Sequence, residues 1–245
     1  MKVVALGAAM MLVAANGAAA QDAGWIYSTT LYGWLPGMTT SIETGSGTIE
    51  SEATASDALS NLDMVFMGTF AAQSDRLGFV GDLLYLDLSN ERPTPLGLLY
   101  GEASVGVRTT ALSGYALYRV TPDPAIAFDI GAGFRAFDLD VDLALTPGIA
   151  AGVSQSLGGS WVDPLLAARV AVPLNEDWTL NGFADWGGTG GGDETWQVFG
   201  AVKYDFNEKW STQAGYRYMD ISKELDGRKV SVDLGGPVVA LSFRF

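Results

Sequence analysis

The chain has 245 residues, with 28 Asp and Glu against 14 Lys and Arg, and it contains neither histidine nor cysteine. Without histidine it cannot build a Ser-His-Asp triad or most zinc sites, and without cysteine it has no disulfide, thiolate nucleophile or iron–sulfur ligand. A formal net charge of -14 argues against nucleic-acid binding, which needs clustered Lys and Arg. The length admits one large all-β domain or two smaller ones, and 31 glycines with 11% aromatic residues favour β structure rich in turns.

The first twenty residues have the features of a secretory signal peptide. Lys2 precedes an apolar run over residues 3–15, and small residues lead to a cleavage site after Ala20. An N-terminal membrane anchor is the alternative, but the run is shorter than the roughly 20 residues that a spanning helix needs. We therefore expect residues 1–20 to be a signal peptide and residues 21–245 to be the exported domain. No later segment is long and apolar enough to span a membrane as a helix, so a membrane location would require strands.

From Trp25 onward, segments of alternating polarity are separated in turn by short and by longer connections. The short connections are 73–77, 121–124, 173–177 and 206–209, and the longer ones are 36–62, 89–102, 143–159, 187–194 and 222–232. These connections imply a single antiparallel β-barrel of ten strands. Eight or twelve strands are the alternatives, if a strand breaks near residues 235–237 or the first hairpin lies in the membrane. Short turns at one end and long loops at the other are typical of bacterial outer-membrane barrels, with both chain ends on the periplasmic side.

The first long connection contains two predicted elements. Residues 39–52 read as a hairpin with a Gly-Ser-Gly tip. Residues 56–62 read as a short helix capped by Ser56, with Leu59 and Leu62 on one face. Such a helix can fold into the barrel mouth or cap the rim, and the sequence leaves both open.

Alternation within the strands predicts which charges point inward. In a barrel strand, lipid-facing and lumen-facing residues alternate, and a charge within the hydrocarbon band belongs on the lumen side. Over residues 126–136 the even positions are apolar while Asp129 and Arg135 are odd, and over residues 162–172 Asp163 and Arg169 repeat this pattern. The same reasoning predicts a set of lumen charges: Asp82, Arg108, Asp129, Arg135, Asp163, Arg169, Asp185, Lys203, Arg217 and Arg244.

Two interpretations of this lumen set remain. Rings of basic side chains can line a narrow anion-preferring channel. Alternatively, the acids and bases form a salt-bridged network that plugs the barrel. We favour the plug, because barrels of about eight to ten strands enclose little more than their own side chains.

Aromatic residues recur at the ends of three strands with a spacing of eight residues. The pairs are Trp178 and Trp186, Trp196 and Tyr204, and Trp210 and Tyr218. For tilted strands this spacing matches an apolar band of about 25 Å between two interfacial aromatic girdles. The alternative is that these rings fill a soluble core.

The last segment, residues 239–245, alternates in polarity and ends in an aromatic residue. It resembles the C-terminal strand of bacterial outer-membrane proteins, whose final Phe is read by the barrel-assembly machinery, so Phe245 is the expected assembly signal. Together with internal segments it resembles a family of proteobacterial outer-membrane β-barrel proteins described as porin-like. The internal segments are Leu31–Gly37, Ser60–Asp63, Gly81–Tyr85, Leu112–Tyr115, Trp161–Leu165 and Ala214–Asp220. The resemblance implies a single barrel in the outer membrane and supplies no substrate or reaction.

The acidic residues gather toward the longer connections. Asp138, Asp140 and Asp142 lie on the lipid-facing parity just beyond Ala136, where the strand should have left the hydrocarbon. One interpretation is that divalent cations bind there beside lipopolysaccharide phosphates, because Ca²⁺ and Mg²⁺ favour clustered carboxylates. The other is a solvated, repulsive outer surface. The spacing matches no calcium-binding loop, so we assign no metal ligands.

The known types of outer-membrane barrel enzyme, such as omptin-type proteases and outer-membrane phospholipases, use a histidine that this chain lacks. The glycine-rich segment 187–193 lacks the Lys-Ser/Thr and the helix of a phosphate-binding loop and reads as a surface loop. We therefore expect no enzyme and no cofactor. The expected function is a structural or interaction barrel of the outer membrane, in contact with lipid and lipopolysaccharide and with a plugged lumen. A narrow porin-like channel for small solutes or ions is the alternative.

Overall fold

The computed structural model describes residues 24–245 except 45–46, 55, 57–61, 94–99, 122–125, 148, 150 and 226–227. The predicted signal peptide and almost all of the predicted helix 56–62 lie outside the described residues, and Leu62, the last residue of that helix, instead begins a strand. Among the described residues, no helix is long and apolar enough to cross a membrane.

The described part is built from β-strands, which we label in chain order. They are β1 (Ile26–Trp34), β2 (Gly37–Thr44), β3 (Gly47–Ala53), β4 (Leu62–Gln73), β5 (Leu77–Pro93), β6 (Tyr100–Arg119), β7 (Ala127–Pro147), β8 (Val153–Pro173), β9 (Trp178–Gly190), β10 (Asp193–Asp205), β11 (Trp210–Leu225) and β12 (Arg228–Arg244).

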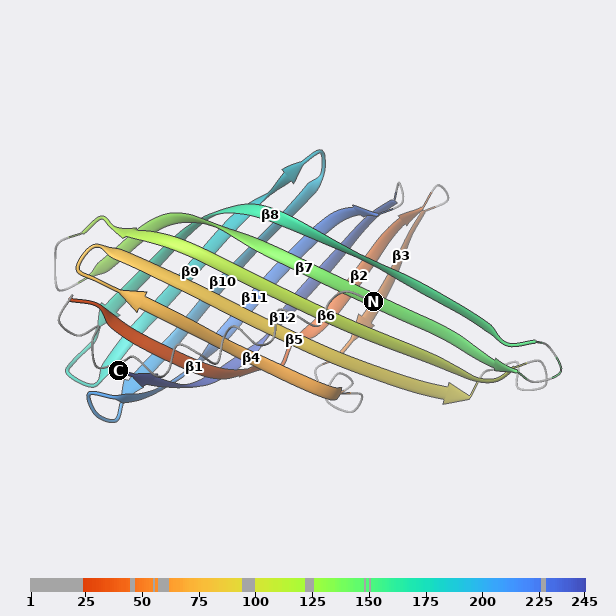
Figure 1. Cartoon of the computed structure of the whole chain (residues 1–245), viewed down its shortest axis with the longest axis horizontal. Coiled ribbons are helices and arrows are strands. Elements are labelled where there is room, and N and C mark those ends of the chain that lie inside the picture. The colour runs from red at the N-terminus through yellow and green to blue at the C-terminus, as the bar shows by residue number, and fades with distance from the viewer. Residues whose placement is uncertain are drawn as a thin grey trace.

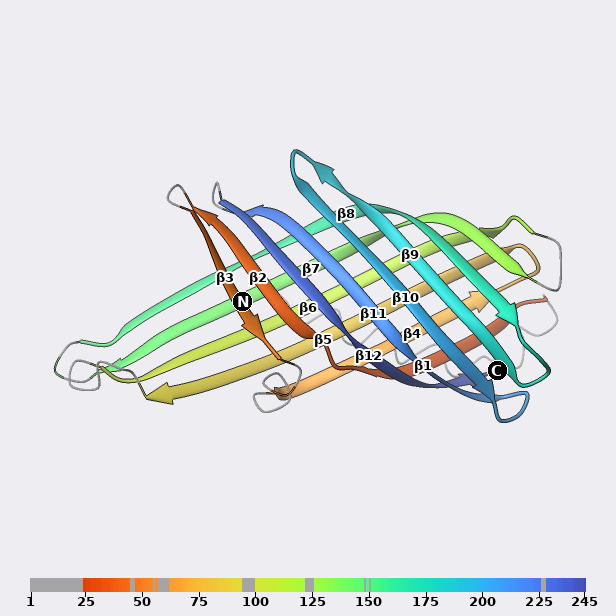
Figure 2. The same cartoon turned by 180° about the vertical axis from the view of Figure 1, so that it is seen from behind.

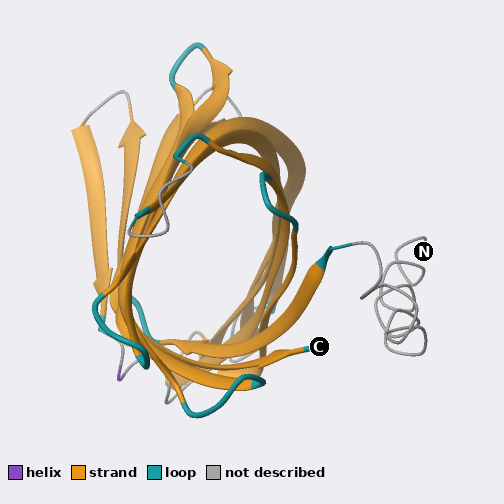
Figure 3. Ribbon diagram, turned by 90° about the vertical axis from the view of Figure 1, so that its left-hand side faces the viewer, coloured by secondary structure: helices purple, strands orange, loops and turns teal. Residues whose placement is uncertain are grey.

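The strands form a closed antiparallel barrel (Figures 1 and 3). β1 pairs with both β4 and β12, so β1 and β4–β12 make a ring of ten strands. The predicted hairpin 39–52 is present as β2 and β3, which extend from the edge of β12. The predicted all-β single barrel of ten strands is therefore confirmed.

The seam of the barrel lies where β12 changes its partner. Residues 230–235 of β12 pair with β2, and residues 238–244 pair with β1. β12 is continuous, so the interruption that the sequence suggested near residues 235–237 lies instead in the facing chain at Leu35 and Pro36. The chains approach closely there, because a Cβ on Gly236 would lie 2.1 Å from the Leu35 carbonyl oxygen.

The two ends of the barrel differ. One end, which we call the short-turn end, carries the tight connections between β4 and β5, β8 and β9, and β10 and β11. At the other, the long-strand end, β5–β8 continue well beyond the ring as a separate wall (Figures 1 and 2). β8 pairs with β7 back to Val153 but with β9 only from Leu165 onward. Much of the described part of the predicted loops 89–102 and 143–159 is therefore strand, because β5–β8 stay paired with one another beyond the ring.

The two faces of the sheet have opposite chemistry. On the outer face, Ile130, Phe134 and Leu166 are 44–64% exposed, whereas Asp129 and Arg135 on the inner face are at most 2% exposed. Apolar side chains that face outward around a charged interior are the arrangement of a membrane barrel. The alternation that the sequence predicted for β7 and β8 is the one observed.

The six predicted girdle aromatics fall into two rows. Ring contacts link Trp178 to Tyr204 at 4.8 Å and Trp196 to Tyr218 at 5.1 Å between centroids. Trp210 contacts Phe243 at 4.8 Å, and Trp186 lies opposite Trp196 in the β9–β10 register. Trp178, Tyr204 and Trp210 thus mark the short-turn side of the apolar band, and Trp186, Trp196 and Tyr218 mark the other side. Their role at the membrane interface stays a prediction.

The close approach at the seam leads to a testable prediction. Gly236→Ala should destabilise the barrel by about 1–3 kcal/mol, because its methyl group would force the Leu35 backbone away from β12. Gly33→Ala on the neighbouring strand is the matched control, since a Cβ there meets nothing within 4 Å. Urea unfolding in detergent micelles measures both variants, and equal stabilities would contradict this account of the seam.

Candidate functional site: the charged lumen

The lumen is filled by alternating polar and apolar layers. Successive inward side chains on a strand are two residues apart, so each step of two moves from one layer to the next. On β6, for example, Ala111 is apolar, Ser113 is polar, Tyr115 and Leu117 pack in an apolar cluster, and Arg119 is charged.

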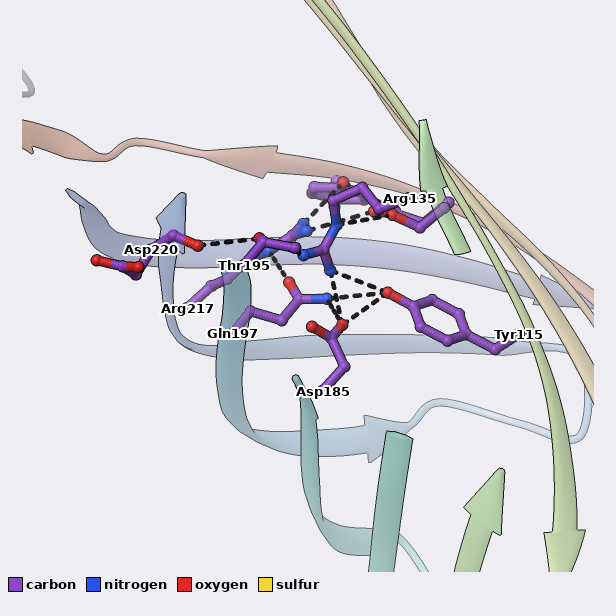
Figure 4. Close-up of polar contacts among 10 residues, drawn as sticks. Tyr115, Arg135, Asp185, Thr195, Gln197, Arg217 and Asp220 are labelled. Atoms are coloured by element: carbon purple, nitrogen blue, oxygen red, sulfur yellow. Dashed lines mark hydrogen bonds and ion pairs between the residues drawn. The ribbon is translucent and has the colours of Figure 1, made fainter. Parts of the chain in front are cut away.

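Arg135 on β7 is the centre of the polar layer and is completely buried. Its Nε donates to Ser113 Oγ at 3.1 Å, and its Nη1 donates to Thr195 Oγ1 at 3.0 Å. Its Nη2 donates to Tyr115 OH at 3.0 Å and to Asp185 Oδ2 at 2.6 Å (Figure 4). The side chains that receive these bonds come from β6, β9 and β10, so one guanidinium joins β7 to three other strands.

Asp185 balances this charge and extends the network. Its Oδ2 also accepts hydrogen bonds from Tyr115 OH at 2.7 Å and from Gln197 Nε2 (Figure 4). Gln197 Oε1 in turn accepts from Arg217 Nε at 2.8 Å. The Gln197 amide therefore links the carboxylate of Asp185 to a second arginine.

Arg217 on β11 carries the network to the barrel seam. Its Nη1 donates to Tyr32 OH at 3.1 Å, and its Nη2 lies 3.4 Å from Asp82 Oδ2. Tyr32 OH donates to the other oxygen of Asp82 at 2.9 Å. The guanidinium also lies 4.8 Å from the ring centroid of Trp34, a cation–π distance. The central layer thus holds Asp82 and Asp185 against Arg135 and Arg217, and its formal charges cancel.

Apolar clusters close this layer on both sides. Toward the short-turn end, Leu117, Leu165 and Ala167 are buried together with the Tyr115 ring, and Val80 and Phe183 pack against them. Toward the long-strand end lies a second cluster of buried residues: Trp34, Met67, Leu84, Ala111, Phe137, Met219 and Val238. The polar network is therefore sealed between two apolar layers.

Beyond each apolar cluster, toward the end of the barrel, lies a further group of charged side chains. At the short-turn end, Asp129 binds Arg119 Nε at 2.8 Å and Arg169 Nη2 at 2.6 Å. At the long-strand end, Lys223 Nζ lies 2.7 Å from Asp193 and 3.7 Å from Asp163. The Lys223 hydrogen bond holds the pKa of Asp193 below its usual value. The local formal charge is thus positive at the first group and negative at the second.

The structure brings nine of the ten predicted lumen charges to the inner face, and Arg108 is the exception. Arg108 is 53% exposed on the outer face of the β5–β8 wall, where its Nη2 lies 3.1 Å from Asp87 Oδ2. On β6 the inward residues are the odd ones, such as Ser113 and Leu117, so the expectation for Arg108 was wrong. It lies beyond the apolar band, where no hydrocarbon forces a charge inward.

Sequence reasoning missed several members of the network. Arg119 and Lys223 lie at the ends of the alternating segments, where the strands were expected to give way to turns and loops. Tyr32, Tyr115 and Gln197 are uncharged, so a search for charges did not select them. Their positions in the alternating segments are inward-facing ones. A search for all inward-facing polar residues, charged or not, would have selected them.

The outer face carries a different charged feature just beyond the second aromatic row. Asp220 lies directly opposite Asp233 in the β11–β12 register, and Tyr218 OH donates a hydrogen bond to Asp233. Partial burial, together with the neighbouring Asp233 carboxyl, raises the pKa of Asp220 to about 6. Within the described residues, no group of three acidic side chains is arranged to hold a metal ion.

Comparison with solved structures identifies the class of fold. The outer-membrane protease OmpT from Escherichia coli matches with a TM-score of 0.61 at 10% identity, over 90% of this chain and 97% of that chain. The translocator domain of the autotransporter NalP from Neisseria meningitidis has a TM-score of 0.44 at 16% identity, over 93% of each chain. No protein-family model matches the sequence, and a search of curated proteins finds no match. The protein has the fold of the proteobacterial outer-membrane β-barrels, and at these identities the similarity extends to the fold alone.

The central ion pair gives a second prediction. Arg135→Ala should cost about 3–5 kcal/mol of unfolding free energy, because it leaves the Asp185 carboxylate buried without its partner. Arg108→Ala is the control, since removing one exposed ion pair should cost about 1 kcal/mol or less. Heat-modified mobility on gels and urea unfolding report both variants. Equal losses would show that the central pair does not stabilise the barrel.

The Asp220 carboxyl gives a pH-dependent prediction. Because its pKa is higher in the folded than in the unfolded state, ionising it opposes folding as the pH rises through about 4 to 6. Asp220→Asn should therefore raise the unfolding temperature at about pH 8 and leave it unchanged at about pH 4. Thermal unfolding followed by circular dichroism at both pH values tests this. An Asp220→Asn variant that at about pH 8 unfolds at the same temperature as wild type, or at a lower one, would contradict it.

Proposed function

We propose that the protein is an integral outer-membrane barrel with a closed lumen and a structural or interaction role. In this proposal it is exported by the signal peptide 1–20, and its short-turn end faces the periplasm. The long β5–β8 wall and the β2–β3 hairpin then face the outside. The asymmetry between the two ends supports this orientation, because bacterial barrels have short periplasmic turns and longer external segments.

The observation that carries the closed lumen is the complete burial of the Arg135–Asp185 pair at its centre. Both side chains are 0% exposed, so solvent reaches the pair from neither end. The adjoining Leu117 and Leu165 are 2% and 3% exposed. The central charges are paired with counter-charges, and an apolar layer lies on each side of them. This arrangement favours a plug over a water-filled path.

The outer surface supports an interaction role. Asp140 and Asp142 are exposed on the outer face of the β5–β8 wall, and Asp138 precedes them on the same parity. Arg108 lies opposite Asp140 in the β6–β7 register and pairs with Asp87, so the patch as a whole stays acidic. Divalent cations held there could bridge the patch to lipopolysaccharide phosphates, since such cations bind oxygen ligands from both partners.

The C-terminus supports recognition by the barrel-assembly machinery. Phe245 exchanges two backbone hydrogen bonds with Tyr27, of 3.0 and 3.2 Å, at the end of the seam. Its ring also stacks with those of Tyr27 and Phe243 at 6.0 Å. A terminal residue that completes the last rung of the barrel is well placed to signal that the final strand is available for closure.

A non-catalytic role agrees with the state of the lumen carboxylates. The network gives Asp82, Asp129 and Asp185 arginine partners, and burial shields the last two from any substrate. A general acid or base must reach the proton it transfers, and these groups are committed to ion pairs instead. The chain also lacks histidine, the commonest general base.

Planar-bilayer recording tests the closed lumen directly. The purified barrel should insert without producing stable single-channel currents, because the apolar layers leave no aqueous path. Arg108→Ala, on the outer wall, is the control and should behave in the same way. Stable currents whose ion selectivity changes in Arg135→Ala or Arg169→Ala would overturn the proposal and establish the narrow channel instead.

A further inference from the structure

A small polar cavity lies inside the short-turn end of the barrel, away from the central network. It has a volume of about 130 Å³ and lies among β1, β10, β11 and β12. Three serines line it: Ser28 on β1, Ser211 on β11 and Ser242 on β12. The pairing brings them together, because Ser211 lies opposite Ser242, while Ser28 lies opposite the cavity residue Arg244. Three hydroxyl groups from neighbouring strands thus line one pocket.

Basic side chains surround the same cavity. Lys203 and Arg244 line it from the strands, and Lys209 lines it from the turn between β10 and β11. Two acids, Asp205 and Glu208, are also present, so the lining carries one formal positive charge in excess. In a chain with a net charge of -14, this positive pocket is a local reversal of sign.

The Arg244 guanidinium is only weakly engaged by its protein neighbours. Its Nη2 lies 4.0 Å from Asp205 Oδ1, and its Nη1 lies 3.5 Å from the Glu208 carbonyl oxygen. Asp205 binds Lys203 more closely, at 2.8 Å. The guanidinium, 47% exposed, therefore keeps donor capacity for a ligand in the cavity.

The surroundings reinforce the positive potential. Across the same end of the lumen, Arg119 and Arg169 share the single carboxylate of Asp129. An excess of one sign of charge between low-dielectric walls raises the local concentration of ions of the opposite sign. Inside this end of the lumen, the two arginines therefore add to the excess of positive charge around the cavity.

We propose that this cavity binds a phosphate group, either inorganic phosphate or the phosphate of a small ester or lipid headgroup. Arg and Lys provide charge-assisted hydrogen bonds to phosphate oxygens, and the hydroxyls of Ser28 and Ser211 can donate to the remaining ones. The third hydroxyl, that of Ser242, also shares a hydrogen bond with Thr30 Oγ1 at 2.7 Å. Hydroxyls and cations converge from four strands, which suits a tetrahedral oxyanion better than a planar carboxylate. The volume suits a small group, since pockets for drug-sized ligands span about 300–1,000 Å³.

The cavity reaches the short-turn end, since the turn residues Glu208 and Lys209 line it, and the layer of Leu117 and Leu165 separates it from the other end. The ligand would therefore enter and leave from the periplasm, a direction that rests on the orientation proposed above. Binding itself needs only the local pocket. Failure of the closed-lumen proposal would appear as conductance, and failure of this one would appear as a wild-type barrel that binds no phosphate.

Isothermal titration of the purified, folded barrel with inorganic phosphate, in neutral detergent at constant ionic strength, tests the site. Wild-type protein should bind one phosphate, and Arg244→Gln should bind it at least about tenfold more weakly, because it loses a charge-assisted hydrogen bond. Arg76→Gln is the matched control, since Arg76 lies on the turn between β4 and β5 outside the cavity and bonds to Tyr118. It should bind phosphate as wild type does.

Competition experiments distinguish the possible sources of the phosphate group and test whether the site prefers phosphate to a carboxylate. Displacement of phosphate by phosphatidylglycerol, supplied in mixed micelles, would assign the site to a lipid headgroup, whereas the absence of displacement would assign it to soluble phosphate. Equal binding of acetate, or equal affinities in wild type and Arg244→Gln, would overturn the proposal. If Arg244→Gln does not fold, Lys209→Gln on the exposed turn replaces it, with weaker binding expected and unchanged binding contradicting the site.

Discussion

The buried ion pair between Arg135 and Asp185 is the interaction on which the interior of this barrel depends. Two charges removed from water are tolerated only when each keeps a partner and further hydrogen bonds. That requirement explains why Tyr115 and Gln197 converge on the pair, and why Gln197 passes the connection on to Arg217. The resulting network ties strands from opposite sides of the ring and fixes its cross-section.

The closure of the ring depends on a second constraint, the division of β12 between two partners. A strand that pairs with β1 near the short-turn end and with β2 beyond it can close the barrel and support an external hairpin at once. The chain must leave the ring at Leu35 and Pro36 for this, and Pro36 has no amide hydrogen to lose from the ladder. The side chain missing from Gly236 leaves space for that departure.

The sequence predicted the interior best where the bilayer itself restricts it. Asp129, Arg135, Asp163 and Arg169 were assigned to the lumen because a charge within the hydrocarbon band has no alternative. Arg108 was misassigned because it lies beyond that band, where either face of the strand meets water. The same physics explains why the loops 89–102 and 143–159 were expected in place of strands: outside the membrane, alternation no longer distinguishes strand from loop.

The partners within the lumen could not be predicted, for a different reason. Alternation says which face a side chain occupies, whereas a contact across the lumen depends on the tilt and stagger of strands far apart in sequence. Arg217 and Tyr32, for example, are 185 residues apart and meet only when the barrel closes. Single-strand patterns carry no information about such a meeting, so the network became visible only in the folded chain.

The distribution of charge along the lumen argues against one conducting path. At the short-turn end, Arg119 and Arg169 outnumber their shared partner Asp129, whereas at the other end Asp163 and Asp193 outnumber Lys223. A selective channel needs a continuous path along which one kind of ion is favoured. Here opposite signs prevail at the two ends, and apolar layers separate them. In the closed barrel proposed above, neither end therefore offers a permeating ion a favourable course to the other.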